Sequence, residues 1–114
     1  MLALNSSRRR KKLLSAPELA ATTPNHSYYP VFVEPAFGIS RDTLYQRLRE
    51  RGIHGRRYFY PLISEMPMYR GLPSAAPANL EQATRLAQQV LCLPIYPALT
   101  DEQQDRVIVA IKAP

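Results

Sequence analysis

The chain has 114 residues, and 46% of them are apolar. This favours one globular domain and excludes wholesale disorder. The 15 basic and 9 acidic residues give a net charge of +6, but five of the basic residues form one run, Arg8–Lys12. Because the charges nearly balance outside this run, the folded part is not predicted to bind nucleic acid. The single cysteine excludes an internal disulfide and predicts a cytoplasmic protein.

The N-terminal segment gives no sign of a membrane anchor. No stretch approaches the roughly 18 apolar residues of a membrane-spanning helix. Pro17 and Glu18 interrupt the apolar residues after the basic run, which argues against a secretory signal. We therefore expect residues 1–24 to form a basic, disordered arm and linker, with ordered structure from about Ser27. A nuclear-localisation or transit peptide is an alternative for this segment.

Aromatic and β-branched residues predict a strand over Ser27–Val33. Pro30 cannot donate to a ladder, so we expect this strand at an edge or with a bulge. The following helix is predicted to begin after Ser40 as N-cap and to run to about Arg51. Leu44 and Leu48 then face the core, while the arginines mostly face water.

Gly52 is expected to end this helix as a left-handed residue. A short strand is predicted over Arg56–Tyr60, where Pro61 stops it. The connection from Ile63 to Ala78 is long and rich in proline, and loops of this length commonly bind something.

Two further helices are predicted in the C-terminal half. Asn79 is the expected N-cap of the first, with Gln82 in a capping box, and the apolar run 91–93 reads as a buried strand. Thr100 and Gln103 form the capping box of the last helix, whose expected buried stripe is Val107, Ile108 and Ile111. The order of elements predicts an α+β fold, or a small α/β layer, with helices on a short sheet.

Few residues in the chain are candidates for catalysis or metal binding. His26 and His54 lie on different elements and have no metal-ligand spacing to Cys92, so we expect no metal site and no catalytic residue. Cys92 lies among apolar residues and is interpreted as a buried structural thiol, with a Cys–His nucleophile pair as the alternative. With four glycines in all, the chain has no Gly-rich phosphate loop.

Residues 56–61, with the sequence RRYFYP, are the strongest candidates for a binding site. Strand alternation would put Arg57 and Phe59 on one face and Arg56, Tyr58 and Tyr60 on the other. Guanidinium and phenol groups suit a ligand that carries phosphate or sugar. From these residues alone, an edge strand with a solvated polar face is the favoured interpretation. A ligand site formed by Arg56, Arg57, Tyr58 and Tyr60 is the alternative.

Several segments together resemble the C-terminal domain of the DegT/DnrJ/StrS family of pyridoxal-phosphate (PLP) aminotransferases. The resemblance covers Asn25 to Ile111, whereas residues 1–24 match poorly. Its most specific part is the closing stretch AQQVLCLPIYPALTDEQQDRVIVAI, and the others are NHSYY with VFV, RDTLYQRL with the later GI, RRYFYPL, and MPMY. A histidine that the family often has after Pro-Leu is replaced by Ile63, so no role is carried over for it.

The resemblance implies the small C-terminal domain of a fold-type I PLP enzyme, over residues 25–114. With it, Arg56, Arg57, Tyr58 and Tyr60 become the candidate substrate-pocket residues, near the substrate or the domain interface. It implies transfer of an amino group from an amino acid, commonly glutamate, to a nucleotide-linked keto-sugar in amino-sugar and polysaccharide biosynthesis. The family's PLP lysine lies in a large N-terminal domain, and the context of Lys11, Lys12 and Lys112 does not match it. We therefore expect the chain alone to bind no PLP and to be inactive without a large domain or a homodimer partner.

Two alternatives follow from the same sequence. In the first alternative, the chain is a non-catalytic module whose basic arm contacts nucleic acid or an acidic partner. In the second, it is a truncated or split-gene product that pairs with a separate large-domain chain. A steep salt dependence that needs residues 8–12 would favour the first.

Overall fold

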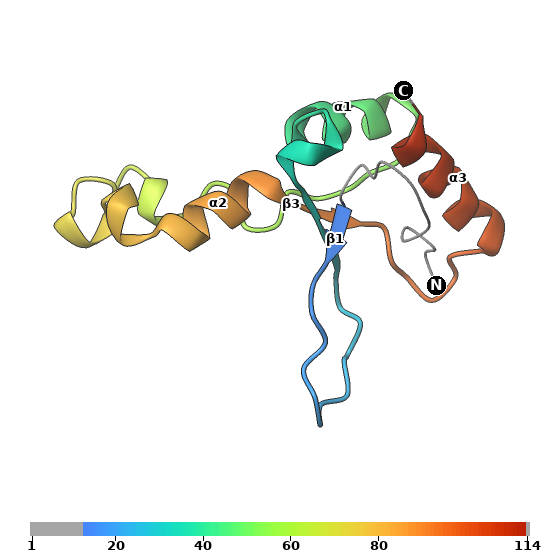
Figure 1. Cartoon of the computed structure of the whole chain (residues 1–114), viewed down its shortest axis with the longest axis horizontal. Helices are drawn as coiled ribbons and strands as arrows, with labels where there is room; N and C mark the ends of the chain where they lie inside the picture. The colour runs from blue at the N-terminus through green and yellow to red at the C-terminus, as the bar shows by residue number, and fades with distance from the viewer. Residues whose placement is uncertain (1–12, 114) are drawn as a thin grey trace.

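The computed structural model describes residues 13–113, which form an α+β domain (Figure 1). A three-stranded antiparallel sheet carries two helices on one face, which confirms the predicted α+β fold class. The strands are β1 (Leu13–Ser15), β2 (Tyr29–Val33) and β3 (Val90–Leu93), and the α-helices are α1 (Arg41–Glu50), α2 (Glu81–Gln89) and α3 (Asp101–Lys112). None of the helices in residues 13–113 has the length and apolar character needed to cross a bilayer.

The sheet has the order β1-β2-β3, so β2 is its central strand. The prediction that ordered structure begins near Ser27 is therefore wrong, since Leu13 of β1 pairs with Val33 of β2. The prediction of an edge strand is also wrong for β2 as a whole. Pro30 nevertheless lies beyond the three residues of β2 that face β1, so its missing N–H removes no bond to that neighbour. Residues 1–12, with the basic run, lie outside the described residues.

Helix α1 forms as its sequence predicts. The Ser40 hydroxyl accepts a hydrogen bond from the Thr43 N–H at 3.1 Å, which satisfies one free donor of the first turn. Leu44 and Leu48 are fully buried against the sheet and α3. Gly52 has φ +73°, a left-handed value that any residue with a Cβ adopts at a cost, and it ends the helix as expected.

Arg49 and Arg51 are exposed, as predicted for the arginines in and after α1, but Arg41 departs from that prediction. Arg41 is 2% exposed, and its Nη1 donates to the carbonyls of Ala87 and Val90, both at 2.8 Å. Arg47 and Arg51 each donate to a carbonyl in the last turn of α3. The charge of α1 therefore satisfies carbonyl groups at the C-terminal ends of α2 and α3, where helix dipoles favour cations.

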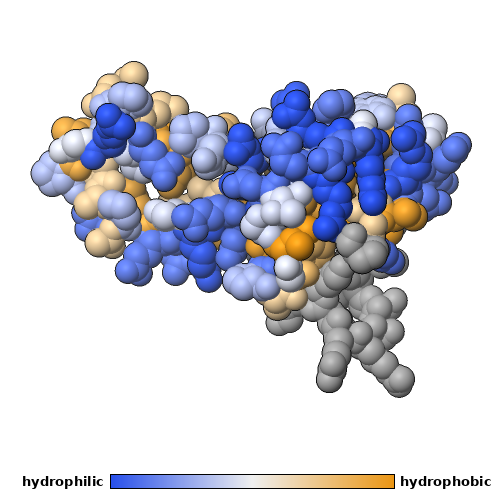
Figure 2. Space-filling model, turned by 90° about the horizontal axis from the view of Figure 1, so that it is seen from above, coloured by the Kyte–Doolittle hydropathy of each residue, from blue (hydrophilic) through white to orange (hydrophobic). Residues whose placement is uncertain are grey.

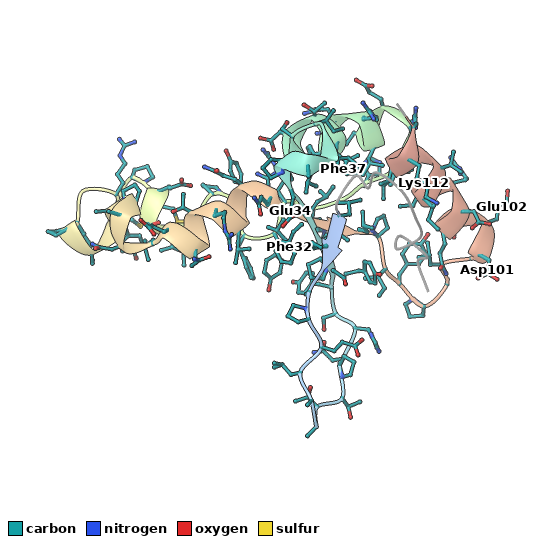
Figure 3. The ribbon with its side chains drawn as sticks, in the orientation of Figure 1. Phe32, Glu34, Phe37, Asp101, Glu102 and Lys112 are labelled. Carbon is teal, nitrogen blue, oxygen red and sulfur yellow. The ribbon has the colours of Figure 1, made fainter. Side chains whose placement is uncertain are left out.

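Helix α3 confirms its predicted cap. The Thr100 hydroxyl accepts from the Gln103 N–H, and the Gln103 side chain accepts from the Thr100 N–H. Figure 3 shows Asp101 and Glu102 at this end of the helix and Lys112 at the other, the arrangement that suits the helix dipole. Val107 and Ile111 are buried as predicted, whereas Ile108 is only half-buried and Ala110 completes the buried stripe.

A long segment of the chain extends away from the body of the molecule. The body is defined here as the sheet together with α1 and α3. Residues 57–80, here called the projecting segment, contain three short 3₁₀ turns, at Ile63–Glu65, Pro73–Ala75 and Pro77–Asn79. Together with α2 they extend to one side (Figure 1). The predicted cap at Asn79 is wrong, because α2 begins after Leu80 and the Asn79 side chain donates to the Pro73 carbonyl.

The core lies between one face of the sheet and helices α1 and α3. Alternate residues of β2 and β3 point into it, joined by Phe37 from the 3₁₀ turn at Pro35–Phe37 and by apolar residues of both helices. Its buried members are Val31, Val33, Phe37, Leu44, Leu48, Ile53, Leu91, Leu93, Val107, Ala110 and Ile111. Seen from above, polar residues dominate the surface of the body, while apolar residues are interspersed on the projecting side (Figure 2).

Candidate functional site

Residues 56–61 do not form the strand that the sequence predicts. Only Arg56 pairs with β3, through bonds of 2.9 and 2.8 Å between its main chain and that of Cys92. Phe59 has φ +46°, which breaks the extended backbone, and the Tyr60–Pro61 peptide is cis. The chain therefore turns where it was expected to run straight, and the predicted alternation of side chains is lost.

The turn gathers Arg57 and Tyr60 with three residues of α1. We call this group the Tyr60 cluster, and its members are Arg41, Asp42, Tyr45, Arg57 and Tyr60. The Arg57 guanidinium carbon lies 4.4 Å from the centre of the Tyr60 ring and 5.1 Å from that of Tyr45. These distances are within the range of cation–π attraction, which fixes Arg57 between the two rings.

The charge of the Tyr60 cluster is partly neutralised. Asp42 Oδ1 lies 2.9 Å from Arg41 Nε and 3.6 Å from Arg57 Nη1. Arg41 is already committed to main-chain carbonyls, and its guanidinium lies 5.3 Å from the Tyr60 ring. Arg57, with 34% of its side chain exposed, is thus the cation of the cluster that can still meet a ligand.

A broad hollow of about 710 Å³ borders the Tyr60 cluster. It is lined by Arg41, Asp42 and Tyr60, and also by the carboxylates of Glu34 and Glu65. Three carboxylates beside one buried arginine make this a poor place for a free anion. A sugar ring with several hydroxyl groups finds both donors and acceptors here.

The other two predicted site residues lie elsewhere. The Tyr58 ring packs edge-on against Tyr28 with centroids 5.0 Å apart, and it also touches Phe59. Arg56 lines a separate groove beside α3 that shares no lining residue with the hollow at the Tyr60 cluster. The structure therefore brings Arg57 and Tyr60 together and divides them from Arg56 and Tyr58. Whether any of the four contacts substrate remains a prediction.

Arg41 is the member of the Tyr60 cluster that sequence reasoning missed. Its signal was its spacing, since Arg41, Leu44 and Leu48 stand at i, i+3 and i+7 and therefore share the buried stripe of α1. An arginine in such a stripe predicts a buried polar partner, here the carbonyl groups at the end of α2.

Cys92 is buried, as predicted. Burial raises the pKa of its thiol, and the nearby positive charge of Arg56 opposes this effect only in part. A thiol that holds its proton is a weak nucleophile, so the Cys–His alternative gains no support although His54 lines the same groove. Within residues 13–113, no three His, Cys, Asp or Glu side chains are grouped in a way that could hold a metal ion.

The described residues do not fit PLP. An aminotransferase holds this cofactor through a lysine amine, with a carboxylate opposite the pyridinium nitrogen. Lys112 is the only lysine in residues 13–113, and it is exposed at the C-terminal end of α3. The carboxylates of Asp101 and Glu102 lie at the opposite end of that helix (Figure 3).

Comparisons with known proteins agree with the fold. A sequence profile of the DegT/DnrJ/EryC1/StrS aminotransferase family matches residues 6–112, so the resemblance extends further toward the N-terminus than the expected start at Asn25. The chain is 52% identical over 81 residues to a dTDP-4-amino-4,6-dideoxy-D-glucose transaminase of Escherichia coli, covering 71% of this chain and 22% of that protein. A Shigella dysenteriae transaminase of the same name is 34% identical over 88 residues, covering 77% and 23%.

A solved structure of an aminotransferase is also similar to this chain. The aminotransferase TlmJ from Streptoalloteichus hindustanus superposes with a TM-score of 0.67 at 28% identity, over 87% of this chain and 25% of that one. The chain thus spans about a quarter of the length of each of these proteins. With a sequence profile, close relatives and a fold in agreement, the chain belongs to the DegT/DnrJ/EryC1/StrS aminotransferase family.

Proposed function

We propose that this chain is the C-terminal small domain of a PLP-dependent aminotransferase that moves an amino group from glutamate to a nucleotide-linked keto-sugar. The product would be an amino sugar for polysaccharide synthesis in the cytoplasm. The observation that carries the proposal is the 52% identity to a dTDP-amino-sugar transaminase, because it extends over most of this chain. The single cysteine, buried as a thiol, is in keeping with a cytoplasmic location.

The chain alone is inactive in this proposal. Its described residues offer no lysine in a site that could hold PLP, so the cofactor must be held by a large domain, in the same assembly or in a homodimer partner. The projecting segment supports this, since it exposes apolar side chains that a partner would cover. They include Phe59, Ile63, Met68 and Leu72, each more than half exposed.

Within such an enzyme we assign Arg57 and Tyr60 to the side of the cleft that meets the keto-sugar nucleotide. The Arg57 guanidinium is held between two tyrosine rings and remains a third exposed. Arg57 is not among the residues that line the hollow with the three carboxylates, so its exposed part can bind the charged part of a substrate. The Tyr60 hydroxyl can bond to a sugar hydroxyl.

A chimeric enzyme tests the proposal. The matching segment of the Escherichia coli relative is replaced by the corresponding residues of this chain, and transamination is measured with dTDP-4-amino-4,6-dideoxy-D-glucose and 2-oxoglutarate. We expect a chimera that binds PLP and turns over. Arg57→Gln in the chimera should raise KM for the sugar nucleotide, whereas Arg85→Gln, at an exposed position of α2 outside the Tyr60 cluster, should leave it unchanged. A chimera that is loaded with PLP but inactive would contradict the proposal.

The isolated chain provides the complementary test. PLP and then borohydride are added, and the product is examined for a lysine adduct by absorbance and mass. We expect no turnover and no adduct at one defined lysine. A trapped adduct together with turnover of a keto-sugar nucleotide would show that the chain is an enzyme by itself.

The alternative function, a binding module with a basic arm, gains no specific support. Its run Arg8–Lys12 lies outside the described residues. The alternative remains a prediction, tested by the salt dependence of any binding and by deletion of residues 8–12.

A further inference from the structure

The position of the Arg57 side chain depends on helix α1 more than on its own stretch of chain. The neighbouring Arg56 pairs with β3, but this pairing ends there. The guanidinium of Arg57 is held by side chains instead. Its carbon lies 5.1 Å from the Tyr45 ring centre and 4.4 Å from that of Tyr60, and its Nη1 lies 3.6 Å from Asp42 Oδ1. Two of these three contacts come from α1.

Tyr45 is the contact of Arg57 that is itself most firmly fixed. Its side chain is half-buried and packs against the core, next to the fully buried Leu44. One turn earlier, Arg41 ties α1 to two carbonyls at the C-terminal end of α2, both at 2.8 Å. A side chain on a helix that is anchored in this way is placed more precisely than one on a loop. The Tyr45 ring is therefore a rigid surface for the guanidinium.

The other two contacts of Arg57 are less firm. Tyr60 belongs to the projecting segment and is 48% exposed. The Asp42 side chain is 61% exposed, and its Oδ1 lies closer to Arg41 Nε, at 2.9 Å, than to Arg57. Ion pairs of such exposed groups contribute little, because water screens them and both side chains lose conformational freedom. The Tyr45 ring is thus the fixed surface against which the Arg57 guanidinium is ordered.

We propose that Tyr45 is a positioning residue for Arg57. Its ring attracts the guanidinium through the cation–π interaction and so holds the side chain ready for the charged part of the substrate. An arginine that is ordered in advance loses less conformational freedom on binding, so the substrate binds more tightly. The role in the reaction rests on the proposed function, which assigns Arg57 to the substrate side of the cleft, whereas the placement of the guanidinium over Tyr45 does not.

The placement is tested on the full chain, labelled with ¹⁵N, through the NMR signal of the Arg57 side-chain Nε–H, which Arg57→Gln assigns by removing it. The π-electrons of an aromatic ring shield protons that lie over its face, so we expect this proton at a lower frequency than that of the exposed Arg85. Tyr45→Leu should move the signal toward the Arg85 value, whereas Tyr45→Phe, which keeps the ring, should not. Gln46→Leu, at an exposed neighbouring position of α1, is the matched control and should leave the signal in place. An unmoved signal in Tyr45→Leu would overturn the proposal.

The consequence for the reaction is tested in the chimeric enzyme. Tyr45→Leu should raise KM for the sugar nucleotide about fivefold and change kcat by less than about twofold, because a less ordered Arg57 weakens binding without altering the chemistry. A general loss of structure would instead reduce the active fraction, and so kcat, and leave KM unchanged. Tyr45→Phe should keep the parent KM. In an Arg57→Gln background, Tyr45→Leu should have no further effect on KM.

The outcomes separate this proposal from the proposed function. If Arg57→Gln leaves KM unchanged, Arg57 does not meet the substrate, and both its assignment and the role of Tyr45 are overturned. If Arg57→Gln raises KM but Tyr45→Leu does not, or if the two effects add independently, only the positioning role is overturned. Because Tyr45 packs partly against the core, circular dichroism checks the helical signal of each variant. A Tyr45→Leu variant that loses this signal is replaced by Tyr45→Met, since methionine fills irregular space without a ring.

Discussion

The body of the molecule buries its large side chains, whereas the projecting segment exposes most of its own. Leu44, Leu48 and Leu91 of the body have no measurable exposure, while Phe59, Ile63 and Met68 are 69%, 68% and 72% exposed. Burial of apolar surface is the main favourable contribution to folding. The body is therefore where this chain gains its stability, and the projecting segment adds little.

The hydrogen bonds of the two regions differ in the same way. In the body, Arg41, Arg47 and Arg51 connect α1 to carbonyls that lie 46 to 66 residues away in the sequence. The hydrogen bonds defined for residues 62–79 are local, and the one that spans the most residues runs from Asn79 to Pro73. A segment with local bonds and outward apolar groups has the features of a surface made for a partner, since its contacts do not stabilise it alone.

Truncation of a leucine in each region should give the largest difference. Leu44→Ala leaves a cavity in the core, so we expect the free energy of unfolding to fall by about 3 to 4 kcal/mol. Leu72→Ala, in the projecting segment, removes a side chain that is 51% exposed and should change it by less than about 0.5 kcal/mol. Urea denaturation followed by circular dichroism measures both. Similar losses for the two variants would show that the projecting segment is packed as tightly as the body.

Substitution of the buried Arg41 should have the next largest effect on the free energy of unfolding. Arg41→Met keeps much of the apolar stem but removes the donors to Ala87 and Val90, leaving carbonyls without these partners. We expect a loss of about 2 to 3 kcal/mol, again from urea denaturation. Arg49→Met changes the charge equally at an exposed position of the same helix and should cost less than about 0.5 kcal/mol. If both variants lose the same stability, net charge and not the hydrogen bonds explains the effect.

The elements that local rules define are the ones that the sequence predicts well. The Ser40 cap, the Leu44 and Leu48 stripe, and the Thr100 and Gln103 box each depend on residues within seven positions of one another. Strand β3 is a short apolar run that is buried along its whole length. In all of these, side-chain chemistry and spacing determine the structure without help from distant parts of the chain.

The sequence fails to predict the elements that depend on residues far away in the chain or on an unusual backbone conformation. Strand β1 has three residues, and nothing but pairing with β2 distinguishes Leu13–Ser15 from a linker. The Tyr60 cluster exists because Phe59 adopts a positive φ, a conformation that the sequence signals at glycine or asparagine but not at phenylalanine. As a result, the residue types of the candidate site could be predicted, but not the division that places Arg57 with Tyr60 and Arg56 in another groove.

Two glycines, one in the body and one in the projecting segment, differ in backbone conformation. Gly52 of the body has φ +73°, and Gly52→Ala should reduce stability by about 1 kcal/mol through backbone strain, since nothing lies within 4 Å of the added methyl group. Gly71 in the projecting segment has equal space but no positive φ. Gly71→Ala should therefore be neutral or slightly stabilising. Thermal unfolding of both variants measures the difference, and a loss at Gly71 as large as that at Gly52 would contradict this explanation.

The smallest effect is a pH dependence from Cys92. Burial raises the pKa of the folded thiol above its ordinary value of 9.0, against the weaker effect of Arg56. The unfolded chain therefore releases this proton first, so the stabilising contribution is complete below pH 9.0 and is lost as the pH rises toward the folded pKa. We expect the stability of the parent to fall faster above pH 9 than that of Cys92→Ala, in which the remaining groups titrate alike. Parallel curves for the two chains would contradict the raised pKa.

Alkylation of thiols extends this last comparison to the projecting segment. Cys92 is 4% exposed, so iodoacetamide should modify it only as fast as the body opens. In a Cys92→Ala background, Leu72→Cys puts a thiol where the parent side chain is 51% exposed, and it should react at the rate of a free cysteine. Addition of the large domain in trans should slow the reaction at position 72, because a partner that covers the projecting segment shields that thiol, and leave Cys92 of the parent protected as before. An unchanged rate at position 72 in an active assembly would mean that the partner docks on another face.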